Sequence, residues 1–352
     1  MAERVFLHVG APKSGTTFLQ TVLWDNRERL ADNGVLVPGR NLFDFNRAAT
    51  AVRKVDARHK GANSPGATWR RMLAETQSWP GTVVMSNEWF SLATAEDAQR
   101  ALGRLDPSEV HIVFTARNFV AQVPAAWQET LKLGTCQPLP DFVAGLTAVG
   151  ERWSWWTLDP AEVLARWGAT LPADRVHVVT VPPRGSEPGL LWARFANVCG
   201  IDADAYDTEL GQANESLGAE AAALLQRLGP LLRAAIDADT AHWTEQYRWI
   251  RRYVGHELLV PQGGSRIGLH PAEEAVLRQR AAQTIDALVG AGYHVAGDLG
   301  ELTAESSSGR HPDDVSAADM LEVALTLTAH LMRRLRDETL RADQAEERTS
   351  PC

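Results

Sequence analysis

The stretch RVFLHVGAPKSGTTFLQ, residues 4–20, constrains the fold more than any other part of the sequence. It begins as a short apolar run that ends in a glycine. A loop with a second glycine, Gly15, follows, and then a helix-like pattern that closes at Gly34. A strand, a glycine loop and a helix in that order point backbone N–H groups and the positive end of the helix at one place. The sequence therefore predicts a βα unit whose loop binds an anionic group.

Three more apolar runs have the character of buried strands, at residues 81–88, 109–117 and 174–183. Helical stretches separate them, and this alternation predicts an α/β fold with a parallel sheet flanked by helices. After the run at residues 109–117 we expect a helix that Pro124 either kinks or delays. From about residue 202 the strand signals stop, so the rest is expected to be helical.

The C-terminal part differs in composition from the rest of the chain. Residues 301–314 are polar and contain three consecutive serines, which predicts a linker. Residues 315–347 then form one long amphipathic pattern. We expect one domain over residues 1–300 and a helical C-terminal extension over residues 301–352. The long helix either packs back on the domain, forms a homodimer contact or is a mobile tail.

Charge and composition narrow the classes of partner. The formal net charge of −9 argues against a nucleic-acid partner. The three cysteines are widely spaced, which fits a cytoplasmic location, and no apolar run is long enough to predict a membrane span. Residues 40–71 are an exception, with 8 basic and 2 acidic side chains. This basic segment either helps to hold an anionic ligand or faces solvent.

The glycine loop departs from the nucleotide-hydrolase pattern G-x-x-x-x-G-K-[ST]. Gly10 and Gly15 frame four residues as that pattern requires, but Thr16 and Thr17 follow where the lysine should stand. The lysine of this loop is Lys13, two residues before the second glycine. The loop therefore suits an anion that Lys13 and the backbone amides neutralise.

The ends of the neighbouring strands also argue against a Mg²⁺–triphosphate site. Such sites need an aspartate at a strand end to help hold the metal. Here one strand is followed by Glu88 and the other ends in Arg117. We therefore expect no metal at this site.

Two segments resemble the sulfotransferases that use 3'-phosphoadenylyl sulfate (PAPS). PKSGTT, residues 12–17, resembles their 5'-phosphosulfate loop, and VFTARNFVAQVPAAWQE, residues 113–129, is similar to their second motif. The two motifs occur in the expected order, and the resemblance covers roughly residues 4–220. It implies a P-loop-like sulfotransferase fold for the domain over residues 1–300.

The resemblance implies a role for each matching residue. Lys13 would contact the bridging oxygen of the phosphosulfate and stabilise the leaving phosphate. Arg117 would bind the 3'-phosphate. Family members also place a serine on this phosphate, but Ala125 stands at that position, and Gln122 is the expected substitute. The residues expected to bind the 5'-phosphate through amides and hydroxyls are Ser14, Gly15, Thr16 and Thr17.

Sulfuryl transfer to a hydroxyl needs a general base. Some family members use a histidine near the end of the corresponding strand, and carbohydrate-type members use a glutamate. Glu88 is therefore our candidate base, and the alternative is a helix-start or surface carboxylate. His59 is the next candidate base, whereas His8, inside the first strand, is expected to be a hydrogen-bonded core residue.

Together these residues imply metal-independent, in-line transfer of a sulfuryl group from PAPS to a hydroxyl of a small molecule or carbohydrate. Two alternatives stay open at this point. One is a P-loop kinase-like phosphotransferase, against which the missing lysine and aspartate count. The other is a catalytically idle module that binds PAPS or its desulfated form, PAP.

Overall fold

The computed structural model describes residues 2–54, 61–106, 108–208, 216–236, 243–303 and 307–349. The chain divides into two compact units. The sheet unit comprises Met1–Val123, Val143–Gln212 and Glu274–Ser306, and the helical unit comprises Pro124–Phe142, Ala213–Glu273 and Ser307–Cys352. The predicted domain boundary at residue 300 stays a prediction, since this division follows contacts rather than chain order.

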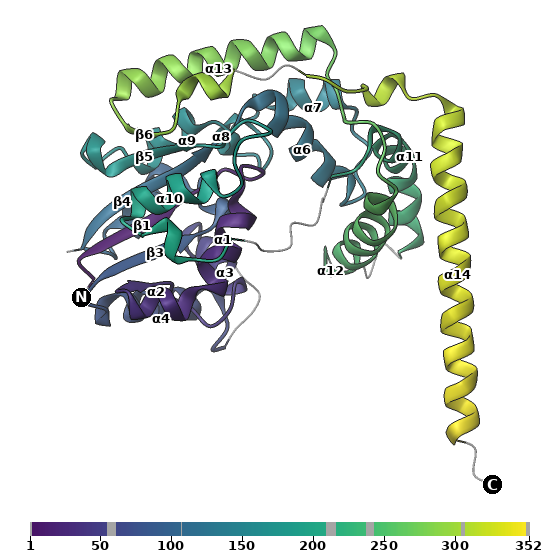
Figure 1. The fold of residues 1–352 in the computed structure, drawn as a ribbon, viewed down its shortest axis with the longest axis horizontal. Coiled ribbons are helices and arrows are strands. Elements are labelled where there is room, and N and C mark those ends of the chain that lie inside the picture. The colour runs from purple at the N-terminus through teal and green to yellow at the C-terminus, as the bar shows by residue number, and fades with distance from the viewer. Residues whose placement is uncertain are drawn as a thin grey trace. The chain divides into compact units, whose positions relative to one another are not determined.

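The sheet unit is built on six parallel strands in the order β2-β3-β1-β4-β5-β6 (Figure 1). In chain order the strands are β1 Arg4–His8, β2 Val35–Leu36, β3 Thr82–Ser86, β4 Glu109–Ala116, β5 Val176–Thr180 and β6 His294–Ala296. The predicted α/β fold with a parallel sheet flanked by helices is confirmed. Strand β6 shows that the expectation of no strand beyond residue 202 was wrong.

The central strands are almost continuously apolar because helices cover the sheet. Every residue of β3 and of β5 is buried, and Val5, Leu7 and Ile112 belong to the same large core.

The helices and helical turns assigned to the sheet unit or beginning in it are α1 Thr16–Asp25, α2 Arg27–Asp32, α3 Phe43–Val52, α4 Pro65–Ser78, η1 Glu88–Leu92, α5 Ala95–Leu102, α6 Phe119–Leu131, α8 Trp155–Leu158, α9 Pro160–Trp167, η2 Ala173–Arg175, α10 Leu190–Cys199, η3 Ala203–Ala205 and η6 Leu299–Leu302.

Helix α6 begins directly after the strand-end arginine. The Oδ1 of Asn118 accepts a hydrogen bond from Val120 N at 2.9 Å and so caps the first turn. Pro124 lies inside the helix. The alternative in which Pro124 delays the start of this helix is therefore wrong.

The helical unit contains α11 Ala219–Ala235, α12 Trp243–Gln246, the π-helix η4 Tyr247–Leu259, η5 Val260–Gln262, η7 Pro312–Asp314 and α14 Ala317–Thr349, while α7 Leu139–Gly145 and α13 Pro271–Ala291 belong partly to each unit. The predicted long C-terminal helix is confirmed as α14 (yellow in Figure 1). Met320 near its start packs in a small core with Ala219 and Ala223 of α11. The searched helices include none that is both long enough and apolar enough to cross a membrane.

Candidate functional site

The register of the sheet brings three strand ends to one edge of the sheet unit. Strand β1 lies between β3 and β4, and His8 pairs with Ser86 on one side and with Val113 on the other. The glycine loop leaves β1 at this edge, Glu88 follows β3, and Arg117 follows β4. Ligands of parallel α/β sheets bind at the carboxyl ends of the strands. The fold therefore gathers the predicted site residues where a ligand is expected.

The glycine loop has an unusual backbone. Gly10 has a φ of 146°, Gly15 a φ of 82°, and Lys13 a φ of 63°. The left-handed φ of Gly15 favours glycine, and an added Cβ there would also require the end of the Leu191 side chain to move. A lysine in the left-handed region is uncommon, and such conformations concentrate at functional sites.

The N-terminus of α1 offers backbone donors to an anion. Gly15 occupies its N-cap position, and no side chain of the described residues caps this helix end. The first N–H groups of a helix have no intrahelical partner, and the helix dipole adds positive potential there. Thr16 is buried, whereas Thr17 is exposed. This helix end is therefore suited to the 5'-phosphate predicted for it.

Hydroxyl groups beneath the loop fasten it to the sheet. Ser14 Oγ donates to Ala11 O at 2.5 Å and lies 2.6 Å from Thr115 Oγ1. Thr115 Oγ1 donates to Gly10 O at 2.9 Å. The side chain of Ser14 is fully buried. The Ser14 hydroxyl thus holds the loop in shape, while its predicted contact with a phosphate stays a prediction.

His8 completes this buried network from the sheet. Its Nδ1 lies 2.8 Å from Ser86 Oγ, and its Nε2 lies 3.1 Å from Thr115 Oγ1. Complete burial lowers the pKa of His8 to about 4, against a smaller opposing effect of a backbone hydrogen bond with Gly10. The ring is therefore neutral at pH 7. The prediction of a hydrogen-bonded core histidine is confirmed.

Arg117 and Gln122 hold the loop from the other side. Arg117 Nη1 donates to Lys13 O at 2.8 Å, and Gln122 Nε2 donates to Pro12 O at 2.8 Å. Arg117 is half-buried, whereas Gln122 is fully buried. The amide of Gln122 therefore supports the loop backbone in this structure. Its predicted contact with a 3'-phosphate in place of the serine missing at Ala125 remains a prediction.

Glu88 lies beside the helix that starts at the glycine loop. Its Oε2 accepts a hydrogen bond from Gln20 Nε2 of α1 at 2.9 Å, and the residue is half-buried. Asn87 caps η1, because its Oδ1 accepts from Trp89 N at 3.0 Å. The Glu88 carboxylate is thus not needed for capping and is held toward α1. No sequence motif singles out Gln20, although it stands one helical turn after Thr16.

His59, the alternative base, lies outside the residues that the structure describes.

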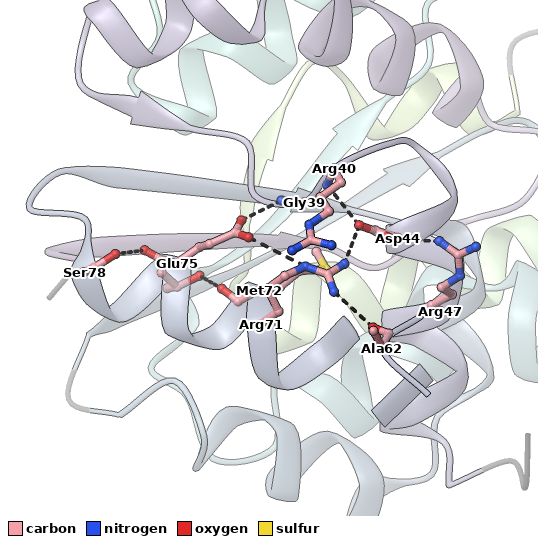
Figure 2. Close-up of polar contacts among 10 residues, drawn as sticks. Gly39, Arg40, Asp44, Arg47, Ala62, Arg71, Met72, Glu75 and Ser78 are labelled. Atoms are coloured by element: carbon pink, nitrogen blue, oxygen red, sulfur yellow. Dashed lines mark hydrogen bonds and ion pairs between the residues drawn. The ribbon is translucent and has the colours of Figure 1, made fainter. Parts of the chain in front are cut away.

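The basic segment at residues 40–71 contains a buried ion-pair cluster (Figure 2). The Asp44 carboxylate accepts from Arg47 Nη1 at 2.7 Å, from Arg71 Nη2 at 2.7 Å and from Arg40 N at 2.9 Å. Burial works to raise the pKa of Asp44, but these hydrogen bonds and the charge of Arg71 lower it below its ordinary value. Arg71 of α4 therefore joins that helix to α3, whereas the Arg47 pair lies within α3.

One group in the helical unit has metal-ligand residue types. Donor atoms of His270, Glu273 and His311 lie within 4.8 Å of one another. However, His311 Nδ1 accepts the backbone N–H of Asp313 at 3.1 Å, which places the ring proton of neutral His311 on Nε2. That nitrogen lies 3.2 Å from Glu273 Oε1, and we assign a buried histidine–carboxylate pair there.

No family model matches the chain, and no curated protein does. A solved sulfotransferase resembles it. The similar structure is the crystal structure of a sulfotransferase from Alicyclobacillus acidocaldarius, with 17% sequence identity and a TM-score of 0.38. The match covers 68% of this chain and 98% of that chain.

Proposed function

We propose that the chain is a sulfotransferase that moves a sulfuryl group from PAPS to a hydroxyl of a small molecule or carbohydrate. The observation that carries the proposal is the gathering of three features at one sheet edge. These are the uncapped helix end behind Lys13, the strand-end Arg117 and the carboxylate of Glu88. The first two suit a nucleotide with phosphates at both ends, and the third suits a proton acceptor.

In the proposed reaction the loop and the N-terminus of α1 bind the phosphosulfate. Glu88 accepts the proton of the acceptor hydroxyl while the hydroxyl oxygen attacks sulfur. The bond from sulfur to the bridging oxygen breaks, and PAP leaves with the electron pair. Lys13 stabilises the charge that develops on this leaving phosphate. The hydrogen bond from Gln20 orients the Glu88 carboxylate for proton transfer.

Titration calorimetry with PAP and with ATP–Mg²⁺ tests the nucleotide part of the proposal. We expect PAP to bind and ATP–Mg²⁺ to bind much more weakly, because the loop lacks the lysine after Gly15 and the strand-end aspartate. The reverse preference would favour a kinase-like phosphotransferase. Consumption of PAPS with an extract as acceptor source then separates an enzyme from an idle PAP-binding module.

A further inference from the structure

Two arginines flank the helical turn that carries Glu88. Arg53 occupies the C-cap position of α3, and Arg152 lies shortly before α8. Both α3 and α8 pack against η1. Arg53 ends one helix that packs against the turn carrying Glu88, and Arg152 shortly precedes the other.

Arg152 is held in place by an aromatic surface. Its guanidinium carbon lies 4.7 Å from the centre of the Trp89 ring, and Trp89 packs edge-on against Trp153 at 5.7 Å. Trp89 is the residue after Glu88. A guanidinium over an indole face keeps its N–H donors for other partners. Within the described part of the chain, Arg152 has no ion pair and no hydrogen bond from its guanidinium.

Arg53 also lacks an ion-pair partner among the described residues, and it is half-buried. The negative charge of Asp97 acts to raise the pKa of Arg53, but the Asp97 carboxylate already pairs with Arg100 Nη2 at 2.5 Å. Burial and then the positive charge of Arg152 lower the pKa of Arg53. Burial also lowers the pKa of Arg152.

This arrangement contrasts with the Asp44 cluster in the same basic segment. There a buried carboxylate neutralises Arg47 and Arg71. The positive charges of Arg53 and Arg152 repel each other. No carboxylate of the described residues pairs with either guanidinium. Arg152 is exposed and Arg53 is half-buried, and two like charges close together without a carboxylate partner favour an anion that joins them.

We propose that Arg53 and Arg152 bind an anionic group of the acceptor, so that the acceptor is a hydroxyl compound that already carries a carboxylate, sulfate or phosphate. This inference rests on the proposed function, because it takes Glu88 to be the base. The anion would hold the acceptor beside η1, and a neighbouring hydroxyl of the same molecule would then reach Glu88.

The test uses matched sugar probes that differ in one group. These are 4-nitrophenyl β-D-glucoside, which is neutral, the corresponding glucuronide, which carries a carboxylate, and the 6-sulfate and 6-phosphate of the glucoside. Binding of each is measured by calorimetry with saturating PAP and without nucleotide. We expect at least one anionic probe to bind about tenfold more tightly than the glucoside, as one charged hydrogen bond provides. Comparing the affinities of the three anionic probes also identifies which of the carboxylate, sulfate and phosphate groups the site prefers.

Charge-neutral variants complete the experiment. Arg53→Gln and Arg152→Gln are each expected to reduce this preference to within about twofold. Arg70→Gln, at an exposed arginine of α4 in the same basic segment, is expected to keep it. Equal binding of all probes by the wild type, no binding of any anionic probe, or a preference that survives both variants would overturn the inference. Failure of PAP to bind would instead count against the proposed function, and the probe comparison without nucleotide would still report on the arginines.

Discussion

Glu88 and Gln20 show how a single contact can tie two parts of a site together. The residues are 68 positions apart in the sequence, yet their side chains are joined by a 2.9 Å hydrogen bond. One follows β3, and the other belongs to the helix that begins at the glycine loop. A shift of α1 would therefore also displace the hydrogen-bond donor of Glu88, the candidate base.

Replacing Glu88 by glutamine tests the base directly. Glu88→Gln preserves the size of the side chain but removes its basicity. Turnover is expected to fall about 10²–10⁴-fold, the contribution of a positioned acid or base, while PAP affinity measured by calorimetry stays unchanged. Glu96→Gln, at an exposed glutamate of α5, is the matched control. Near-normal turnover in Glu88→Gln would direct attention to His59.

Arg117 invites a prediction that separates binding from loop support. The guanidinium already donates to Lys13 O, so a lysine at this position keeps the charge but loses the paired donor geometry. Arg117→Lys is expected to weaken PAP binding by about 1.5–3 kcal/mol. The affinity for adenosine 5'-phosphosulfate, which lacks the 3'-phosphate, should change little. Equal losses for both nucleotides would show that Arg117 acts only through the loop.

At the residue level the sequence predicted what local motifs encode. Lys13, Gly15 and Arg117 are site candidates from the sequence because each stands at a fixed place relative to a strand or loop. The partners Gln20 and Thr115 were missed because their roles arise only when distant segments meet. The same is true of Asp44, whose arginines suggested a ligand site in the sequence and form an ion-pair cluster in the fold.

Among the strands, a row of histidines crosses β4, β5 and β6. His111 Nδ1 lies 2.9 Å from His177 Nε2, and His177 Nδ1 lies 3.0 Å from His294 Nδ1. Glu109 accepts from the other nitrogen of His111. Burial, followed by the charges of His111 and His294, lowers the pKa of His177 to about 4. His177 is therefore neutral in the folded sheet at pH 7.

Two buried histidines, His8 and His177, predict how the stability of the fold depends on pH. His177 and His8 each have a folded pKa of about 4, below the ordinary 6.5, so the unfolded chain binds more protons between these values. The stabilisation is present above pH 6.5 and is lost as the pH falls toward 4, by about 1–3 kcal/mol per histidine. Denaturant unfolding at several pH values measures this. His177→Asn is expected to make the loss shallower, and an unchanged slope would contradict the assignment.

Element lengths explain which parts of the fold could be predicted. The four strands with a run of five or more buried or half-buried residues were recognised from their apolar patterns. Strands β2 and β6 have two and three residues, too few to show any periodicity. They are strands only because a neighbouring strand already offers them hydrogen bonds. The alternative in which Pro124 delays the start of α6 was wrong because tertiary packing tolerates a proline within the first turns of this helix.

For the whole molecule, α14 is the feature with the clearest consequence for assembly. Leu321, Leu325, Met332 and Leu335 are exposed along it, each by more than half of its surface. Their spacing of three, four or seven residues is that of a coiled-coil seam. We therefore expect the chain to form homodimers through α14.

Light scattering on a sizing column checks this expectation. The double variant Met332→Lys and Leu335→Lys is expected to convert the dimer to a monomer, because charges at seam positions oppose pairing. Arg333→Lys, which preserves charge on the same helix, is the control and should remain dimeric. A monomeric wild type at micromolar concentration would exclude this seam as an interface. PAP affinity should be the same for all three proteins.

The bonds that fasten the glycine loop also bear on the kinetics of the molecule. Ser14, Thr115, Arg117 and Gln122 fix the loop through backbone oxygens before a nucleotide arrives. Little chain entropy then remains to be lost on binding. We expect the observed association rate of PAP, followed by stopped-flow fluorescence, to rise linearly with its concentration and to fall with added salt, as for a charge-steered encounter. A rate that levels off would reveal a slow rearrangement of the loop. A linear dependence would instead show that the nucleotide binds in a single step to a loop that is already in its bound shape.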